Sequence, residues 1–136
     1  MAAKQIKKLV LQSSFEEMEK LPSFVDSLQR RMACSDEKSG HMMLSLSEAV
    51  NNAIVHGNDL QEEKKVTIIA VLENDILSVS VADEGTGFDP KGIPDPLKEE
   101  NLLNEGGRGI YLIRQYTDEV YFEDNGSKII MAFHLN

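Results

Sequence analysis

The chain has 136 residues, a size that suits one compact domain with a single hydrophobic core. Its 23 acidic and 14 basic side chains give a formal net charge of −9, which argues against a general nucleic-acid binder, because such proteins present basic surfaces to phosphate. The longest apolar stretch, near 66–72, is far short of the roughly 20 residues that cross a bilayer, and no apolar core of signal-peptide length follows Met1. With Cys34 as the single cysteine no internal disulfide can form, and we expect a cytoplasmic protein that binds neither membrane nor nucleic acid directly.

The first elements in the chain are a strand and a helix. Residues 7–12 are predicted to form the strand. Ser14 and Glu17 have the spacing of a capping box, which predicts a helix over about 14–32. Pro22 falls inside this range, and it either kinks the helix or marks the first turn of its main part.

A second helix is predicted from about Asp36 to His56, where Gly57 ends it. At about 100° per residue, one stripe of this helix is apolar, and it consists of Met43, Leu46, Val50 and Ile54. A polar set falls within an arc of about 80° on roughly the opposite side, and it consists of His41, Ser45, Glu48, Asn52 and His56. The helix is therefore expected to have a core face and a polar face.

The remaining elements complete a predicted α+β fold. Strands are expected at 66–72, 76–81, 119–123 and 128–135, and a third helix from Arg108 to about Tyr116. The span 85–107 is long for a plain connection, which indicates a function. Asp124-Asn125-Gly126 predicts a hairpin with a type I′ turn. We expect a two-layer α/β sandwich, with a mostly antiparallel or mixed sheet and the helices on one face.

Glu48 and Asn52 are the first pair of residues whose side chains suit a catalytic or metal-binding role. They lie four residues apart on one predicted helix, so their side chains project to the same side. A carboxylate positions water or accepts a proton from an attacking hydroxyl. An amide oxygen is a hard ligand, suited to a Mg²⁺ ion that also binds triphosphate oxygens. The alternative is that both side chains simply decorate a solvated helix face.

Asp83 ends a predicted strand and precedes Glu84-Gly85-Thr86-Gly87. A carboxylate at this position can accept a hydrogen bond from an exocyclic amine such as the adenine N6, and glycines let the backbone approach a flat ring closely. An ordinary turn after a strand is the alternative.

Gly106-Gly107-Arg108-Gly109 opens the third predicted helix. The N-terminal N–H groups of a helix form an anion site, and glycines admit close approach. Arg108 adds a positive charge for phosphate oxygens. The run is neither a Walker motif nor a dinucleotide fingerprint. A glycine-rich turn without a ligand is the alternative.

Taken together, the three motifs resemble the boxes of the GHKL ATPase superfamily. Glu48-Ala49-Val50-Asn51-Asn52-Ala53 with His56-Gly57 is similar to its N box, Asp83–Gly87 to its G1 box, and Gly107-Arg108-Gly109-Ile110 to its G2 box. Within the superfamily the chain most resembles the bacterial anti-sigma factor serine kinases of the RsbW type. Further matching segments are Phe88-Asp89-Pro90, Asn101-Leu102-Leu103, Gly106 to Arg114, and Asp118-Glu119-Val120. The resemblance covers nearly the whole chain, and it implies a single histidine-kinase-like ATPase domain at 1–136 with the Bergerat ATP-binding fold.

This resemblance implies a role for each candidate residue. Glu48 would be the catalytic base, and Asn52 the ligand of the Mg²⁺ ion that accompanies ATP. Asp83 would receive the adenine amine, with Gly85 and Gly87 shaping the pocket of the base. The phosphates would be lined by Gly107, Arg108 and Gly109, and the loop before them would act as the ATP lid.

The resemblance also implies partners: a serine on a STAS-domain anti-sigma antagonist as substrate, a sigma factor held inactive, and a homodimer. Two departures from the pattern stand out. The lid is short and acidic, and the last strand begins Gly126-Ser127-Lys128, where relatives often have threonines, which makes Ser127 a candidate for the hydroxyl that helps recognise adenine. The alternative function is a catalytically silent, ATP-gated module that sequesters a partner, with Glu48 as a structural acid.

Overall fold

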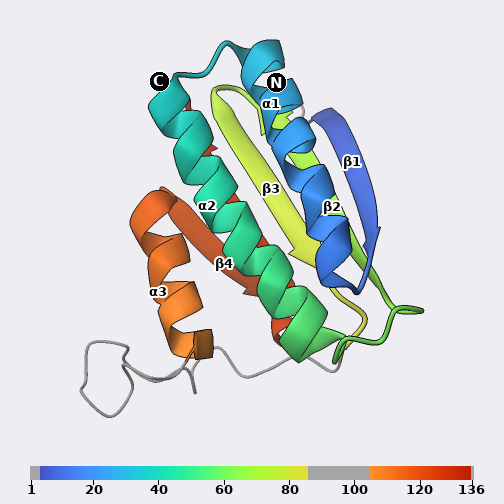
Figure 1. Cartoon of the computed structure of the whole chain (residues 1–136). Coiled ribbons are helices and arrows are strands. Elements are labelled where there is room, and N and C mark those ends of the chain that lie inside the picture. Colours follow the sequence, from blue (N-terminus) through green and yellow to red (C-terminus); the bar gives the residue numbers. More distant parts are fainter. Residues whose placement is uncertain (1–3, 86–104, 136) are drawn as a thin grey trace.

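A computed structural model describes residues 4–85 and 105–135 of the chain. The strands are β1 (Lys4–Gln12), β2 (Lys65–Glu73), β3 (Ile76–Ala82), β4 (Glu119–Glu123) and β5 (Lys128–His134). The helices are α1 (Leu21–Met32), α2 (Asp36–Asn52) and α3 (Glu105–Tyr116). Over the described ranges, the strands form one sheet in the order β1-β2-β3-β5-β4, and each neighbouring pair is antiparallel. The three helices cover one face of this sheet (Figure 1), so the predicted two-layer α+β sandwich is confirmed.

The β4–β5 hairpin forms where it was predicted, but with a different turn. Glu123 pairs with Lys128, which leaves four residues between the strands instead of two. Asp124–Gly126 form a short 3₁₀ helix, with φ angles of 53° at Asp124 and 91° at Gly126. Both the N–H and the Oγ of Ser127 donate to the carbonyl oxygen of Asp124, and these two bonds close the longer loop. The prediction of a type I′ turn is therefore wrong.

The helix predicted over 14–32 is divided into two parts. A 3₁₀ helix, Phe15–Lys20, precedes α1, and Pro22 lies in the first turn of α1, where its missing N–H costs no helical hydrogen bond. The second of the two roles predicted for this proline is thus the correct one. The capping box is absent: Ser14 makes no capping bond, and Glu17 Oε1 instead accepts a hydrogen bond of 3.0 Å from the N–H of Gln12.

The second helix ends earlier than predicted. The α-helical part stops at Asn52 and continues as a short π-helix, Ala53–Gly57, which we call the π turn. The N–H of Asn58 donates to the carbonyl oxygen of Ala53, five residues earlier, at 2.8 Å. The side chain of His56, which was predicted on the polar face, lies in this π turn and is exposed.

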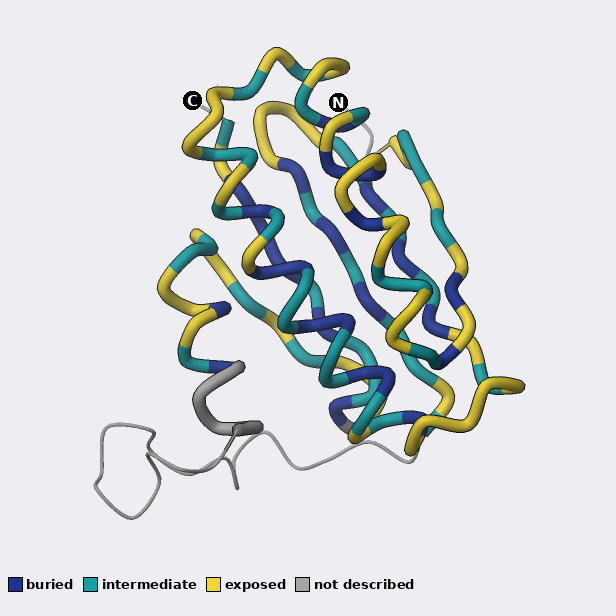
Figure 2. Tube along the Cα trace, viewed as in Figure 1, coloured by how far each residue is buried: buried dark blue, intermediate teal, exposed yellow. Residues whose placement is uncertain are grey.

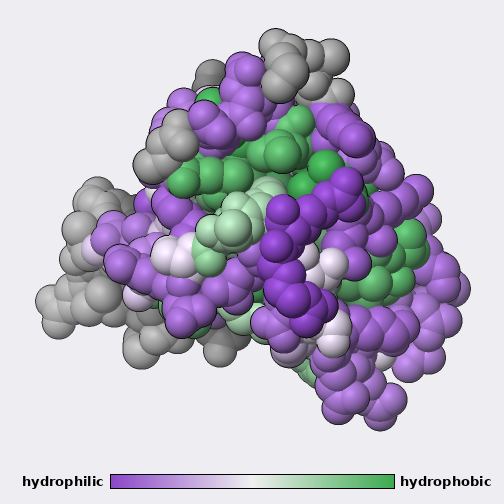
Figure 3. Space-filling view, turned by 90° about the horizontal axis from the view of Figure 1, so that it is seen from above, coloured by the Kyte–Doolittle hydropathy of each residue, from purple (hydrophilic) through white to green (hydrophobic). Residues whose placement is uncertain are grey.

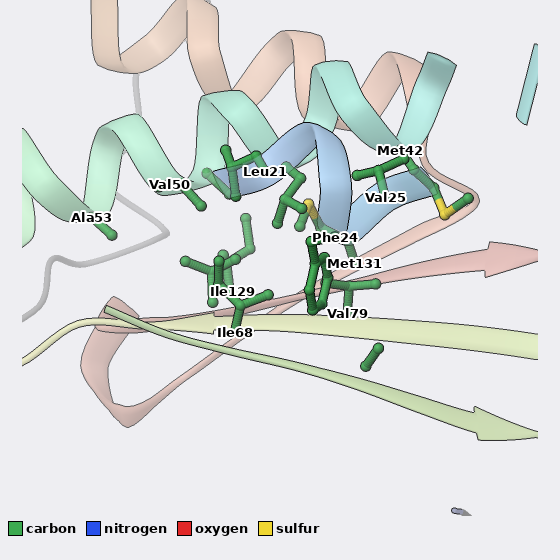
Figure 4. Packing of buried hydrophobic residues seen from close by; sticks show 14 of the residues in the cluster. Leu21, Phe24, Val25, Met42, Val50, Ala53, Ile68, Val79, Ile129 and Met131 are labelled. Atoms are coloured by element: carbon green, nitrogen blue, oxygen red, sulfur yellow. The ribbon is translucent and has the colours of Figure 1, made fainter. Parts of the chain in front are cut away.

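The hydrophobic core lies between the helices and the covered face of the sheet (Figures 2 and 4). Side chains from α1, α2 and three central strands meet there, among them Leu21, Phe24, Val50, Ile68, Val79 and Met131. The apolar stripe of α2 is confirmed at Leu46, Val50 and Ile54, but Met42 rather than Met43 completes it. The sheet and helices are thus joined by the face of α2 that the apolar spacing predicts.

The polar face of α2 is not solvated throughout, as a plain surface helix would be. The ring of His41 lies 5.0 Å from that of Tyr116, so this side of α2 is turned toward α3. Ser45 is only 1% exposed, and Glu48 and Asn52 are partly buried. This face of α2 is therefore only partly exposed to solvent.

Polar side chains dominate the surface at one end of the molecule. Figure 3 looks onto the end where the β2–β3 turn and the start of α2 lie, and it shows a largely hydrophilic surface with apolar groups in two areas. Among the helices of the described ranges, none combines the length and apolar character that a membrane span requires.

Candidate functional site

The last turn of α2, the first turn of α3 and the end of β3 lie at one end of the molecule (Figure 1). Helices α2 and α3 run antiparallel, and the contact between His41 and Tyr116 fixes their relative position. Asn52 and Glu105 are each eleven residues from this contact, which corresponds to about 16 Å along an α-helix. The first turn of α3 therefore lies level with Asn52.

Glu48 and Asn52 keep the predicted spacing of one helical turn. Asn52 is the last residue of α2, and the π turn begins directly after it, so the altered geometry does not affect this pair. Both side chains are partly buried, and within the described ranges neither makes a hydrogen bond or an ion pair. A carboxylate and an amide are thus presented on the side of α2 that faces α3.

Asp83 follows β3 and is held by its backbone and its side chain. Its N–H donates to the carbonyl oxygen of Ser127 at 2.9 Å, and its Oδ1 accepts a hydrogen bond of 2.8 Å from the N–H of Gly85. Burial raises the pKa of the Asp83 carboxyl, and the bond from Gly85 and the charge of Lys64 offset part of this shift. Asp83 is therefore a partly desolvated carboxylate with a fixed orientation, which suits it to accept a hydrogen bond from a ligand.

Gly57 packs directly against this carboxylate. A Cβ atom at Gly57 would lie 2.2 Å from Asp83 Oδ2, and one at Gly85 would lie 2.0 Å from the carbonyl oxygen of Gly57. Both distances are far below van der Waals contact, so only glycine fits at either position without a shift of the backbone or of Asp83. The π turn and the turn after β3 are thus in close contact.

The glycine-rich run lies inside a helix rather than in front of one. α3 begins at Glu105, three residues earlier than predicted, and it includes Gly106, Gly107, Arg108 and Gly109. The first four N–H groups of an α-helix have no acceptor within the helix, so this turn retains the donors that an anion site requires. Gly87 and the predicted lid lie outside the described residues.

Ser127 contacts the site through its backbone. Its carbonyl oxygen accepts the N–H of Asp83, whereas its Oγ donates to the carbonyl oxygen of Asp124 at 2.8 Å. Recognition of adenine by this hydroxyl stays a prediction.

Asn58 is a residue of this region that none of the three sequence motifs includes. Its side chain is fully buried beside the contact between Gly57 and Asp83, and it accepts a hydrogen bond from the N–H of Glu84. An asparagine after a helix-ending glycine is typical of an exposed loop, so the sequence holds no local signal of this burial.

The donor groups fit a metal that arrives with a nucleotide better than a resident metal. In the part of the chain that the structure describes, no three His, Cys, Asp or Glu side chains gather at a metal-binding distance. Mg²⁺ commonly uses one or two protein ligands together with phosphates and water. The amide of Asn52, level with the first turn of α3, fits this mode.

A model of the histidine kinase-like ATPase domain family matches residues 11–133. The chain belongs to this family. This ATPase domain is 27% identical over 119 residues to the serine-protein kinase RsbW of Listeria monocytogenes, which covers 82% of this chain and 76% of that protein. It is 38% identical over 97 residues to the anti-sigma F factor of Clostridium perfringens, which covers 68% of this chain and 69% of that protein.

A solved structure supports the fold of this ATPase domain. It contains the RsbU and RsbW domains of a Mycobacterium tuberculosis protein and matches with a TM-score of 0.66 at 11% identity. The match covers 99% of this chain but 32% of the longer one. The resemblance inferred from the three motifs is confirmed, and membership of an ATPase family implies that the domain binds ATP.

Proposed function

We propose that this domain is an ATP-dependent protein serine kinase that also acts as an anti-sigma factor. Its substrate would be a serine of a STAS-domain anti-sigma antagonist, and it would sequester a sigma factor. The observation that supports this most is the position of Glu48 and Asn52, which lie one turn apart on the side of α2 that faces α3, with Asn52 level with the first turn of α3. The names of the relatives, serine-protein kinase RsbW and anti-sigma F factor, point to the same activity.

Adenine recognition is assigned to the fixed carboxylate of Asp83. The hydrogen bond from Gly85 and the wall formed by Gly57 leave this carboxylate little freedom, so its free acceptor positions are directed in advance. Gly85 and Gly87 shape the pocket for the base. The first turn of α3, with Gly107, Arg108 and Gly109, binds the phosphates through N–H groups and the arginine charge.

Phosphoryl transfer is assigned to Glu48. Its carboxylate accepts the proton of the serine hydroxyl while the serine oxygen forms a bond to the γ-phosphorus and the bond to the ADP oxygen breaks. Asn52 binds the Mg²⁺ ion, which neutralises charge on the phosphates when bound. Because Glu48 and Asn52 are one helical turn apart, α2 holds the base at a fixed distance from the metal ligand.

Incubation with γ-labelled ATP, Mg²⁺ and the cognate STAS-domain protein tests this assignment. We expect a labelled antagonist with the wild type and almost none with Glu48→Gln, which preserves the shape of the side chain but removes the base. Glu37→Gln is the matched control, because Glu37 is an exposed acid in the first turn of the same helix. ATP binding without transfer by the wild type would instead indicate the ATP-gated binding module.

The proposed regulatory role requires two assemblies: a homodimer of the kinase, and a complex of the kinase with a sigma factor. Both would form in the cytoplasm. Light scattering coupled to size-exclusion chromatography measures the mass of the domain alone and with its sigma factor. A monomer of 15.2 kDa at every concentration would contradict the dimer.

A further inference from the structure

The side chain of Asn58 is bonded on three sides in the interior. Its Nδ2 donates to Ser13 Oγ at 2.9 Å and to the carbonyl oxygen of Lys65 at 3.0 Å, and its Oδ1 accepts from the N–H of Glu84 at 2.7 Å. It is 0% exposed. Both amide donors and the amide acceptor are therefore in use, so the orientation of this side chain is fixed.

These bonds join three segments that are distant in the sequence. Ser13 follows β1, Lys65 begins β2, and Glu84 lies in the turn after β3. Ser13 is buried, and its hydroxyl donates a hydrogen bond of 2.7 Å to the carbonyl oxygen of Lys64. The N–H of Lys65 also donates to the carboxylate of Glu84. Glu84 is thus held through both its backbone and its side chain.

The contacts of Asn58 and Gly57 also hold Asp83 in place. Asn58 bonds to the N–H that follows Asp83, and Gly57, its neighbour, packs against the Asp83 carboxylate. The successive residues Gly57 and Asn58 thus contact the successive residues Asp83 and Glu84. Within the described ranges, the Asp83 carboxylate accepts one protein hydrogen bond, from Gly85, so its orientation depends on the position of the turn as a whole.

Asn58 is itself placed by the π turn. Its N–H closes the π turn on Ala53, the residue after Asn52. One segment of about seven residues therefore contains both Asn52 and Asn58. Asn52 lies at the end of the site proposed to bind the phosphates, and Asn58 lies behind the end proposed to bind adenine. A change in the π turn alters the distance between these two ends.

We infer that Asn58, with Gly57, is a positioning residue that sets the orientation of Asp83 and so determines the preference for adenine over guanine. This inference rests on the proposed function, because it takes Asp83 as the acceptor of the adenine amine. GTP has a carbonyl oxygen where ATP has this amine, so a fixed carboxylate repels GTP, whereas a loosened carboxylate moves aside.

Calorimetric titration of the full chain with ATP and with GTP, each with Mg²⁺, tests the inference. Asn58→Ala leaves the N–H of Glu84 without its acceptor, and we expect ATP affinity and the ratio of ATP to GTP affinity each to fall by roughly tenfold. Asn74→Asp is the matched control, because Asn74 lies in the exposed β2–β3 turn at the other end of the molecule, and it should leave both values unchanged.

Ser13→Ala separates positioning from a merely structural role. It removes one member of the buried network but keeps the bond between Asn58 and Glu84, so it should lower the melting temperature without changing the ATP to GTP ratio. A ratio in folded Asn58→Ala within about twofold of the wild type, or an equal loss of ratio in Ser13→Ala, overturns the inference.

Two further variants keep the test decisive if Asn58→Ala does not fold. Asn58→Asp retains an acceptor for the N–H of Glu84 but loses the two hydrogen bonds that the amide donates, so it should lower the melting temperature and keep the ratio. Gly57→Ala places a methyl group against Asp83 and should lose the ratio. The opposite pattern contradicts the inference. Failure of the kinase proposal gives a different result: wild-type protein that prefers ATP to GTP but transfers no phosphoryl group.

Discussion

Two aspartates show how local surroundings give the same residue type opposite effects on stability. Asp83 is partly buried, and this burial raises the pKa of its carboxyl. Asp118 accepts a hydrogen bond of 2.7 Å from the N–H of His134 and lies 3.7 Å from the Lys38 Nζ, and the bond from His134 lowers the pKa of its carboxyl. Ionisation therefore destabilises the fold at Asp83 and stabilises it at Asp118.

Asp83→Asn should stabilise the ligand-free domain while it weakens ATP binding. The amide oxygen still accepts the hydrogen bond from Gly85, and the partly desolvated charge is removed, so we expect the free energy of unfolding at neutral pH to rise by about 1 kcal/mol. Because the folded pKa lies above the unfolded value near 3.8, the free energy of unfolding of the wild type falls as pH rises between these two values. The free energy of unfolding of Asp83→Asn should not show this fall with rising pH.

Urea unfolding between about pH 4 and pH 7, together with ATP titration at neutral pH, checks both expectations. A variant that is less stable than the wild type at neutral pH, or that binds ATP as well, contradicts the role given to Asp83.

Asp118→Asn should have the opposite effect. Its folded pKa is below the unfolded value near 3.8, so its contribution is present at neutral pH and is lost as pH falls through the folded pKa. Because the side chain is partly exposed, we expect a loss of only about 0.5–1 kcal/mol at neutral pH. Glu123→Gln, at an exposed ion pair with Lys128, is the control and should change the free energy of unfolding by less than about 0.5 kcal/mol. An equal effect of the two variants would argue against the special contribution of the bond to His134.

At the scale of the elements, α2 shows what its sequence predicts and what it does not. The spacing of Leu46, Val50 and Ile54 is enough to predict the buried face, because periodicity alone determines which side chains share a face. The π turn was not predictable in this way. It is accompanied by contacts of Gly57 and Asn58 with the turn after β3, and a local pattern contains no information about partners 26 residues away.

The site residues follow the same division. Glu48, Asn52, Asp83 and the glycine-rich run were singled out as candidates because their types and spacing suggest a chemistry. Asn58 was missed because its type is typical of a loop, and its burial depends on Ser13 and Lys65, which reach it only through the fold. Ser45 was assigned to a polar face and is buried, because α3 packs on that side of α2.

Helix α1 should contribute to stability but not to nucleotide binding. Leu28 is 1% exposed and packs in the core between α1 and the sheet, so Leu28→Ala should lower the free energy of unfolding by about 2–5 kcal/mol. Leu112→Ala is the matched control, since Leu112 is 39% exposed on α3 and its loss should cost less than about 1 kcal/mol. Chemical unfolding measures both values. Equal losses in the two variants would contradict the position of the core, and weaker ATP binding by folded Leu28→Ala would contradict the separation of α1 from the site.

At the scale of the whole molecule, a sheet covered on one face by three helices places the candidate residues of the described ranges toward one end. Asn52 ends α2, Asp83 follows β3, and the glycine-rich run begins α3. Ligand binding at such an end joins elements that the chain connects only through long segments, so it should stabilise the fold as a unit.

ATP with Mg²⁺ should therefore raise the melting temperature. At a concentration 100 times its dissociation constant, a ligand that binds only the folded state adds about 2.7 kcal/mol, which corresponds to roughly 9 °C for a domain of 136 residues. Chelation of Mg²⁺ with EDTA should remove much of this shift, and Asn52→Ala should make the shift insensitive to EDTA. Differential scanning calorimetry gives these values, and a shift in Asn52→Ala that still depends on Mg²⁺ would exclude Asn52 as the metal ligand.

Single-turnover transfer of the γ-phosphoryl group from ATP to the STAS-domain antagonist tests the central claim most directly. The rate and the ATP dissociation constant are measured on the same preparations of wild type and Glu48→Gln. We expect the variant to be slower by about 10²–10⁴-fold, with an ATP dissociation constant within about threefold of the wild type, because Glu48 acts on the serine proton and not on ATP binding. A Glu48→Gln variant that transfers the phosphoryl group at the wild-type rate would contradict the assignment of Glu48 as the catalytic base.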